Sequence, residues 1–146
     1  MFAIPLGRHL PHGLVYAVDI EPRQLDALSA RLEDEHIQNV IPVLASPSNP
    51  HLPPGRLDLV LIVDTYHHIE NRVDYFQRLR AAFRDGGRLA ILEYKPGELP
   101  VGPPAHEKIA RGVRESELRS AGYTLIERFD THQYHDFEVW LAAPTD

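Results

Sequence analysis

Apolar and polar positions along the chain follow two periods in turn. Short continuous apolar runs, which are typical of buried strands, alternate with segments in which apolar residues recur every three or four positions, as on one face of a helix. The strongest run, Leu57-Asp-Leu-Val-Leu-Ile-Val63, predicts a strand that is buried on both faces. Strands that are separated by helices pair in parallel, so the pattern predicts an α/β fold with a mostly parallel sheet.

The expected elements cover most of the chain. The strands are Val15–Ile20, Val40–Leu44, Leu57–Val63, Arg88–Glu93, Tyr123–Phe129 and Phe137–Ala142. The helices are Phe2–Leu10, Pro22 to about Glu35, a segment after Asn71 that turns Val73, Phe76, Leu79 and Phe83 inward, and Val113–Ala121. Asn71 is expected to cap its helix, and Asp85-Gly86-Gly87 to stop it with a left-handed turn. A short polar turn joins the last two strands, which predicts a closing antiparallel hairpin.

Composition narrows the class of protein. The 146 residues, 43% apolar and 25% charged, fit one soluble domain over residues 1–146. No apolar run approaches the roughly 18 residues needed to span a membrane, and the first residues make a poor secretory signal, so we expect no membrane partner and a cytoplasmic protein. The chain has no cysteine, which excludes disulfides and thiolate chemistry. A net charge of −6 argues against a nucleic-acid partner.

The segment from Leu14 to Pro22 carries the first candidate chemistry. An apolar β-branched run ends in the carboxylate of Asp19, and a proline then opens a helix. In nucleotide-binding Rossmann units, an acidic residue at the tip of the second strand binds ribose hydroxyls, roughly 20 residues after a glycine-rich loop. Asp19 lies 18 residues after Met1, so that loop and its strand would precede this chain. The alternative is a carboxylate that stabilises the helix N-terminus.

A second candidate segment, Asp64-Thr-Tyr-His-His68, follows the most apolar strand. Open α/β sheets bind ligands at the carboxyl ends of their strands, and Glu93 ends the next strand at the same edge. His67 or His68 could take a proton from a bound substrate. A metal site built from His67-His68 and His132-x-x-His135 is disfavoured, because no third ligand accompanies either pair at a defined spacing. We therefore expect no metal.

Four stretches in this order resemble class I S-adenosylmethionine-dependent methyltransferases of a small bacterial type. They are Gly13-Leu-Val-Tyr-Ala-Val-Asp19, Leu57-Asp-Leu-Val-Leu-Ile-Val-Asp-Thr-Tyr-His-His-Ile69, Arg84-Asp-Gly-Gly-Arg-Leu-Ala-Ile-Leu-Glu93, and Val113 to Trp140 with Ala121-Gly122-Tyr123. The resemblance implies a Rossmann-like, doubly wound sheet of seven strands with a reversed final hairpin. It also implies S-adenosylmethionine as the cofactor.

The resemblance assigns roles to individual residues. Asp19 would bind the cofactor ribose and Ile20 would pack against the adenine, while Asp64 and Tyr66 would line the pocket near the cofactor. Ser46 stands where similar proteins usually place an acidic residue that accepts from the adenine amino group. From their positions alone, Glu93 would touch substrate or stand as a solvated carboxylate at the strand end. His67 or His68 would be catalytic or would pack at the start of a helix.

One element of the family is missing from the sequence. Similar proteins begin with a central strand and a D-x-G-x-G-x-G loop, and neither is present here, so the chain resembles an N-terminally truncated member. Losing a central strand leaves two strand edges unpaired unless they close up or a second copy fills the gap as a homodimer.

The resulting hypothesis is methyl transfer from S-adenosylmethionine to a small acceptor. Two alternatives stay open at this point. One is a truncated, non-catalytic remnant or interaction module, and the other is an NAD-type Rossmann domain, because Asp19 would suit that ribose as well.

Overall fold

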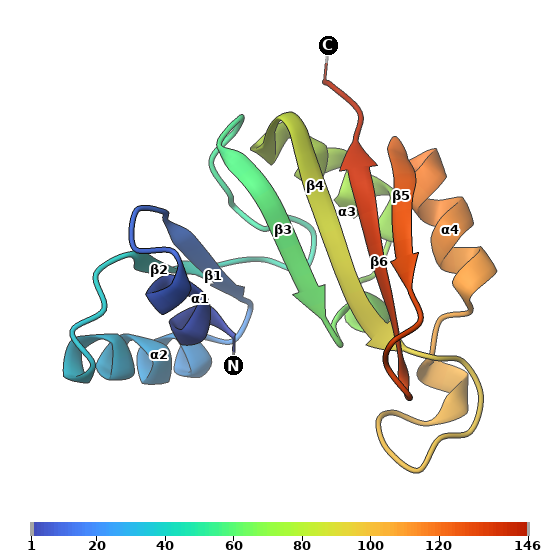
Figure 1. The fold of residues 1–146 in the computed structure, drawn as a ribbon, viewed down its shortest axis with the longest axis horizontal. Coiled ribbons are helices and arrows are strands. Elements are labelled where there is room, and N and C mark those ends of the chain that lie inside the picture. The colour runs from blue at the N-terminus through green and yellow to red at the C-terminus, as the bar shows by residue number, and fades with distance from the viewer. Residues whose placement is uncertain (1, 146) are drawn as a thin grey trace. The chain divides into compact units, whose positions relative to one another are not determined.

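The computed structural model of the protein describes residues 2–145. They form two compact units, with the boundary between Leu52 and Pro53. We call them the first unit and the second unit (Figure 1). The prediction of one domain over the whole chain stays a prediction.

The first unit is a two-stranded parallel sheet with two helices. Its elements are α1 (Ala3–His9), β1 (Val15–Asp19), α2 (Pro22–Asp34) and β2 (Val40–Leu44). The strands pair in register from Val15 opposite Val40 to Asp19 opposite Leu44. A small core holds them together, consisting of Ile4, Leu28, Leu32 and Val40. Gly7 lets α1 approach this core, because a Cβ at that position would lie 2.5 Å from Val40 Cγ2.

The second unit is a four-stranded sheet in the order β3-β4-β6-β5. Its strands are β3 (Leu57–Val63), β4 (Phe83–Tyr94), β5 (Tyr123–Phe129) and β6 (His135–Ala142), and its helices are α3 (Arg72–Leu79) and α4 (Arg111–Ser120). Short 3-10 turns cover Tyr66–His68, Arg80–Ala82 and Ala105–Glu107. Strands β3 and β4 are parallel, and only β6 runs against its neighbours. The α/β class and the closing antiparallel hairpin are thereby confirmed.

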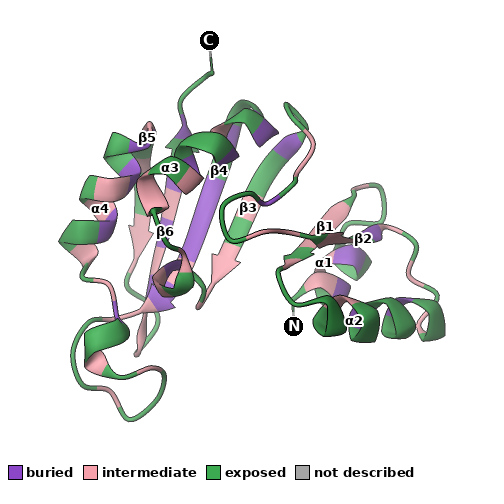
Figure 2. Cartoon of the chain, turned by 180° about the vertical axis from the view of Figure 1, so that it is seen from behind, coloured by how far each residue is buried: buried purple, intermediate pink, exposed green. Residues whose placement is uncertain are grey.

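Helices α3 and α4 lie on the same face of this sheet, as the view from behind shows (Figure 2). The core lies beneath them, where Leu89 and Ile91 of β4, Leu118 of α4 and Trp140 of β6 are fully buried. Because side chains alternate along a strand, the neighbours of these core residues point to the opposite face.

Four strand edges have no partner in the part of the chain that the structure describes, one each on β1, β2, β3 and β5. Strand β1 pairs only with β2, and β3 only with β4. The strand that the resemblance places between them has no counterpart among residues 2–145, and the truncation stays a prediction.

The helix after Asn71 differs from its prediction. It ends at Leu79, and Asp85-Gly86-Gly87 lies inside β4. The Gly55 and Arg56 amides donate 2.9 Å hydrogen bonds to the carbonyls of Ala81 and Ala82, so pairing with the start of β3 takes the chain out of the helix early.

The predicted cap at Asn71 is also wrong. Asn71 has φ 46°, a left-handed conformation, and its side chain makes no capping hydrogen bond to the described helix. A side-chain cap needs extended backbone at this position, which Asn71 does not have.

Buried charges join α4 to β6. The Arg114 guanidinium is fully buried and donates to Asp136 Oδ2 and Glu138 Oε2, at 2.9 Å each. Arg111 also pairs with Asp136, and Arg128 donates to Glu138 Oε1 at 3.0 Å. Burial alone would raise the pKa of Asp136, but the hydrogen bonds from the two arginines outweigh it and lower that pKa. The Asp136 carboxylate is therefore held in its charged form, and both carboxylates are paired with arginines inside the unit.

We predict that Arg114→Ala destabilises the chain by about 3–5 kcal/mol, because it leaves two buried carboxylates short of their central partner. Arg119→Ala is the matched control, since this arginine is 54% exposed and pairs only with Glu115 one turn away. It should change the free energy of unfolding by less than about 0.5 kcal/mol. Urea unfolding measures both, and equal losses would contradict a special role for the buried pairs.

Candidate active site

The predicted site residues of the second unit gather at one end of its sheet. Strands β3 and β4 end there, β6 begins there, and the long loop after β4 lies at the same end (Figure 1). The Asp64 amide donates to the Leu92 carbonyl at 2.9 Å, and Tyr94 lies opposite His135 in the β4–β6 register. Residues that are far apart in sequence are thus brought together at the carboxyl ends of two parallel strands.

His67 and Glu93 form a buried pair. The imidazole Nδ1 lies 2.9 Å from Glu93 Oε1, and the two side chains are only 4% and 1% exposed. Since a carboxylate only accepts, Nδ1 carries the hydrogen and donates it. Glu93 also accepts from the backbone amides of His67, at 3.3 Å, and Tyr94, at 2.9 Å. The carboxylate therefore fixes both the ring of His67 and the chain that carries it.

This geometry corrects the prediction that Glu93 contacts substrate. Its carboxylate is buried and occupied by three hydrogen bonds, so it acts on His67 and is not presented to a ligand. No local pattern in the sequence indicates this partnership, because it requires His67 to turn back toward the neighbouring strand.

His68 is the accessible member of the histidine pair. Its side chain is exposed, and its ring centroid lies 4.1 Å from that of His67, at an angle of 47° between the planes. The two rings are in contact, so the buried histidine has an exposed neighbour through which protons could reach solvent.

Tyr66 is a core residue, in contrast to its predicted place beside the cofactor. It is fully buried, stacks on Phe76 with ring centroids 5.2 Å apart, and donates its hydroxyl to Glu117 at 2.7 Å. Arg72 binds the same carboxylate at 2.8 Å. Burial raises the pKa of Tyr66, and the nearby Glu117 raises it further. An apolar ring with its hydroxyl satisfied inside the unit has a structural role.

Asp64, which follows β3, and His135, at the start of β6, form a second pair. Their Oδ1 and Nε2 atoms are 3.1 Å apart, yet both atoms are buried and neither makes a hydrogen bond of good geometry to any described residue. Burial raises the pKa of Asp64, the charge of Glu93 raises it further, and His135 and His67 oppose the shift. Asp64 has φ 47°, a left-handed conformation that Asp tolerates better than most residues.

The sequence indicated His135 only as a disfavoured metal ligand and did not single out Tyr94. The Tyr94 and His135 rings pack with centroids 4.3 Å apart. The available signal was their place at the end of one strand and the start of the closing strand. No group of three or more His, Asp or Glu side chains in residues 2–145 is arranged to hold a metal ion.

The first unit carries the predicted ribose and adenine contacts. Asp19 is partly buried at the tip of β1, where its Oδ1 accepts the Glu21 amide at 2.9 Å. Glu21 occupies the N-cap of α2 and accepts from Arg23 at 3.4 Å. Glu21 thus makes the side-chain cap of α2, while Asp19 accepts the amide of that N-cap residue, and the alternative of a carboxylate at the helix N-terminus stays open. The Asp19 Oδ2 accepts no hydrogen bond from the described chain.

Ile20 and Ser46 follow the two strand tips. Ile20 is 59% exposed, as a residue that packs against a ligand would be in its absence. Ser46 lies in a tight turn in which its amide and carbonyl pair with Asn49, and its hydroxyl donates to the Asn49 carbonyl at 3.4 Å.

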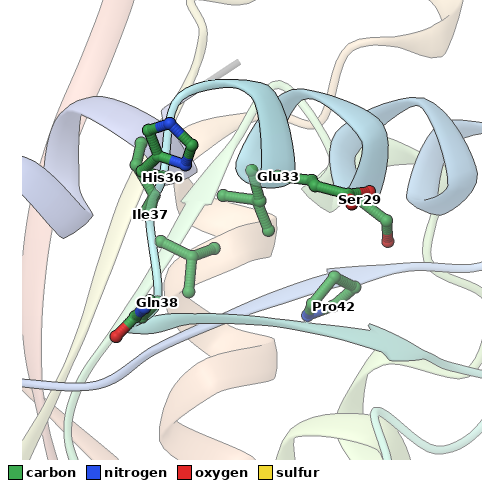
Figure 3. A pocket seen from close by; sticks show the side chains of 8 residues that line it. Ser29, Glu33, His36, Ile37, Gln38 and Pro42 are labelled. Atoms are coloured by element: carbon green, nitrogen blue, oxygen red, sulfur yellow. The ribbon is translucent and has the colours of Figure 1, made fainter.

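The first unit also has a groove between α2 and β2. Figure 3 shows that Ser29, Glu33, His36, Ile37, Gln38 and Pro42 line it. It contains none of the predicted site residues and does not bear on their chemistry.

Residues 1–89 match the model of a family described as a methyltransferase domain, and that match covers more than half of the chain. The chain belongs to this methyltransferase family. No curated protein matches this chain. No described helix is long and apolar enough to cross a membrane.

Solved structures agree with the family in fold. A SAM-dependent methyltransferase from Aquifex aeolicus has a TM-score of 0.90 and 19% identity, over 96% of this chain and 75% of the other. An S-adenosylmethionine-dependent methyltransferase from Mesorhizobium loti has a TM-score of 0.70 and 14% identity, over 88% and 80%. The [4+2]-cyclase SpnF has a TM-score of 0.80 and 10% identity, over 96% and 70%. Both of these methyltransferases are described as dependent on S-adenosylmethionine.

The residues present fit part of that cofactor. The unengaged Asp19 Oδ2 suits a ribose hydroxyl, and the exposed Ile20 suits an adenine face. The glycine-rich loop that normally approaches the methionine part is not in the sequence of the methyltransferase.

We predict that Glu93→Gln destabilises the methyltransferase by about 1–3 kcal/mol. The new NH2 group would face the His67 and Tyr94 groups that now donate to the carboxylate, so buried donors would lose their acceptor. Glu98→Gln, on an exposed loop residue, should change stability by less than about 0.5 kcal/mol. Urea unfolding gives the free energies, and NMR of the imidazole nitrogens reports the His67 tautomer. A Glu93→Gln protein with unchanged stability and tautomer would contradict the assigned role.

The raised pKa of Asp64 predicts how the free energy of unfolding changes with pH. Because its pKa is raised on folding, the folded chain binds this proton more tightly than the unfolded chain, so stability falls as pH rises above the ordinary value of 3.8. Asp64→Asn should match the wild type below that pH and be more stable near pH 7, by less than about 1 kcal/mol, because the side chain is partly exposed. Unfolding across a pH series measures the difference. Lower stability of the variant at neutral pH would mean that attraction to His135 outweighs burial.

Proposed function

We propose that this methyltransferase transfers a methyl group from S-adenosylmethionine to a small acceptor, with His67 and His68 as the catalytic residues. The observation that carries the proposal is the buried His67–Glu93 pair at the carboxyl end of β3 and β4, in a chain of this family. A histidine that is buried, oriented by a carboxylate and touched by an exposed histidine is equipped to handle a proton.

Methyl transfer makes few further demands on the side chains of the protein. The cofactor supplies a methyl group on a positively charged sulfur that is already a good leaving group. The protein must align the acceptor and exclude water, and a base helps only when the acceptor loses a proton. Glu93 holds the His67 ring in one orientation, and the exposed His68 ring beside it offers a proton a route to solvent.

Cofactor binding is assigned to the first unit in this proposal. The Asp19 carboxylate accepts from ribose hydroxyls, Ile20 packs on the adenine, and the Ser46 hydroxyl takes the place of the usual carboxylate beside the adenine amino group. A neutral hydroxyl makes a weaker hydrogen bond than a carboxylate, so we expect moderate affinity. Asp64, which the resemblance places near the cofactor, keeps a carboxylate oxygen free for either ligand.

The partners follow from composition. A net charge of −6 and the lack of a basic and aromatic stripe favour a small-molecule acceptor over a nucleic acid. We expect the protein to work in the cytoplasm. The unpartnered edges of β1 and β3 favour a homodimer if no further strand covers them.

We predict that S-adenosylhomocysteine binds the chain with micromolar affinity and that Asp19→Ala weakens this binding at least tenfold. Loss of a charge-assisted hydrogen bond costs about 1.5–3 kcal/mol, which corresponds to that factor or more. Calorimetric titration measures it, with Asp26→Ala, on the exposed face of α2, as the control that keeps full affinity. No binding to a folded chain would favour the non-catalytic alternative, and equal affinity of the two variants would remove Asp19 from the site.

A further inference from the structure

Five aromatic side chains, none of them buried, form what we call the aromatic wall. They are Tyr94, Phe129, His132, His135 and Phe137. Along β6, His135 and Phe137 share one face, opposite the face on which Asp136 and Glu138 are buried. Phe129 stacks on Phe137 with centroids 5.2 Å apart, and His132 meets Phe137 edge-on at 6.3 Å.

The wall is joined to Asp64 through His135. The Tyr94 ring packs on one side of the His135 ring, at 4.3 Å, and His135 Nε2 lies 3.1 Å from Asp64 Oδ1. The Asp64 side chain is 34% exposed, and its Oδ2 accepts no hydrogen bond from residues 2–145. A carboxylate oxygen that is free to accept therefore stands beside a set of accessible rings.

The loop after β4 packs against the same place. A Cβ at Gly102 would lie 2.5 Å from Tyr94 Cε1, so the loop backbone rests directly on the tyrosine ring. Lys108, only 8% exposed, ties the loop by donating to the Gly97 carbonyl at 2.8 Å. The wall is thus bordered by an ordered segment that holds Tyr94 in position.

We propose that the aromatic wall and Asp64 bind the methyl acceptor, and that this acceptor is a planar aromatic molecule with a hydroxyl group, of the phenol class. Aromatic rings favour a flat aromatic ligand, because stacked and edge-to-face contacts add to the burial of apolar area. A carboxylate oxygen of Asp64 without a hydrogen-bond partner selects a donor at one end of that ligand. The inference rests on the proposed function, since it names the substrate class of the same reaction.

The reaction balances with the groups present. The phenol oxygen forms a bond to the methyl carbon, and the bond from that carbon to the cofactor sulfur breaks with its electron pair left on sulfur. The hydroxyl proton passes to the Asp64 carboxylate, so one positive and one negative charge disappear together. His67 and His68 then serve the later release of that proton.

The surroundings of Asp64 suit it to receive a proton. Burial and the neighbouring charge of Glu93 raise its pKa, while His135 and His67 limit the rise. A carboxylate with a raised pKa is a stronger base than an ordinary one, which suits Asp64 to accept the hydroxyl proton.

The test uses the full chain and 2-naphthol, a fluorescent planar phenol, with 2-methoxynaphthalene as the matched probe that has no proton to give. We expect 2-naphthol to bind and Asp64→Asn to weaken its binding about tenfold, without affecting 2-methoxynaphthalene. Phe137→Leu should weaken both probes. His106→Gln, on a histidine that is 79% exposed, should weaken neither. Binding of 2-naphthol should also fall as acid protonates Asp64, and this pH dependence should be absent in Asp64→Asn.

Turnover and cofactor binding separate this inference from the proposed function. With S-adenosylmethionine present, mass spectrometry should find 2-methoxynaphthalene formed from 2-naphthol. If S-adenosylhomocysteine binds but 2-naphthol neither binds nor is methylated, the phenol inference is overturned and the proposed function stands. Equal weakening of both probes by Asp64→Asn would overturn the role of the carboxylate. If S-adenosylhomocysteine fails to bind, the proposed function fails. In that case, binding of 2-naphthol that depends on Asp64 would still support the aromatic site, and its absence would overturn that site.

Discussion

The antiparallel pairing of β4 with β6 is the constraint on which the second unit depends. Its register sets Glu93 opposite Asp136 and Tyr94 opposite His135. Because adjacent residues point to opposite faces, one pair turns under the helices and the other turns away from them. A slip of one residue would exchange the two faces and place charged groups where rings now lie. The division of the strand ends into a buried ionic side and an accessible aromatic side therefore follows from one register.

The buried ionic side helps to fix that register. Arg114 binds Asp136 and Glu138, two residues of β6 that lie on the same face, so a slipped strand would lose both carboxylates from its reach. Buried ion pairs cost desolvation and contribute little net stability compared with apolar side chains. We interpret these pairs as a device that specifies how α4 sits on the sheet. Glu93 extends the same face to His67, which ties the candidate chemistry to the packing of the unit.

The strands and their succession along the chain could be predicted from the sequence, because each strand leaves a local signal. The apolar run Leu57–Val63, the proline at Pro22 and the turn at Gly122 all act within a few residues, and the structure places β3, α2 and β5 accordingly. The end of α3 could not be predicted, because hydrogen bonds from Gly55 and Arg56 decide it. The inward turn of Tyr66 and the partnership of His67 with Glu93 depend likewise on tertiary neighbours. For the site, the sequence therefore located the strand ends that meet but not the direction of each side chain.

The direction in which each side chain points determines which reaction a shared fold can support. A methyltransferase and a [4+2]-cyclase both resemble this chain in backbone, so the path of the chain alone does not select a reaction. Two features of the described residues bear on the choice. One is a histidine held by a buried carboxylate, and the other is a carboxylate oxygen left free beside aromatic rings. Both concern the movement of a proton, which methyl transfer to a hydroxyl requires. The arrangement of proton acceptors, more than the fold, is the physical argument for a protic acceptor.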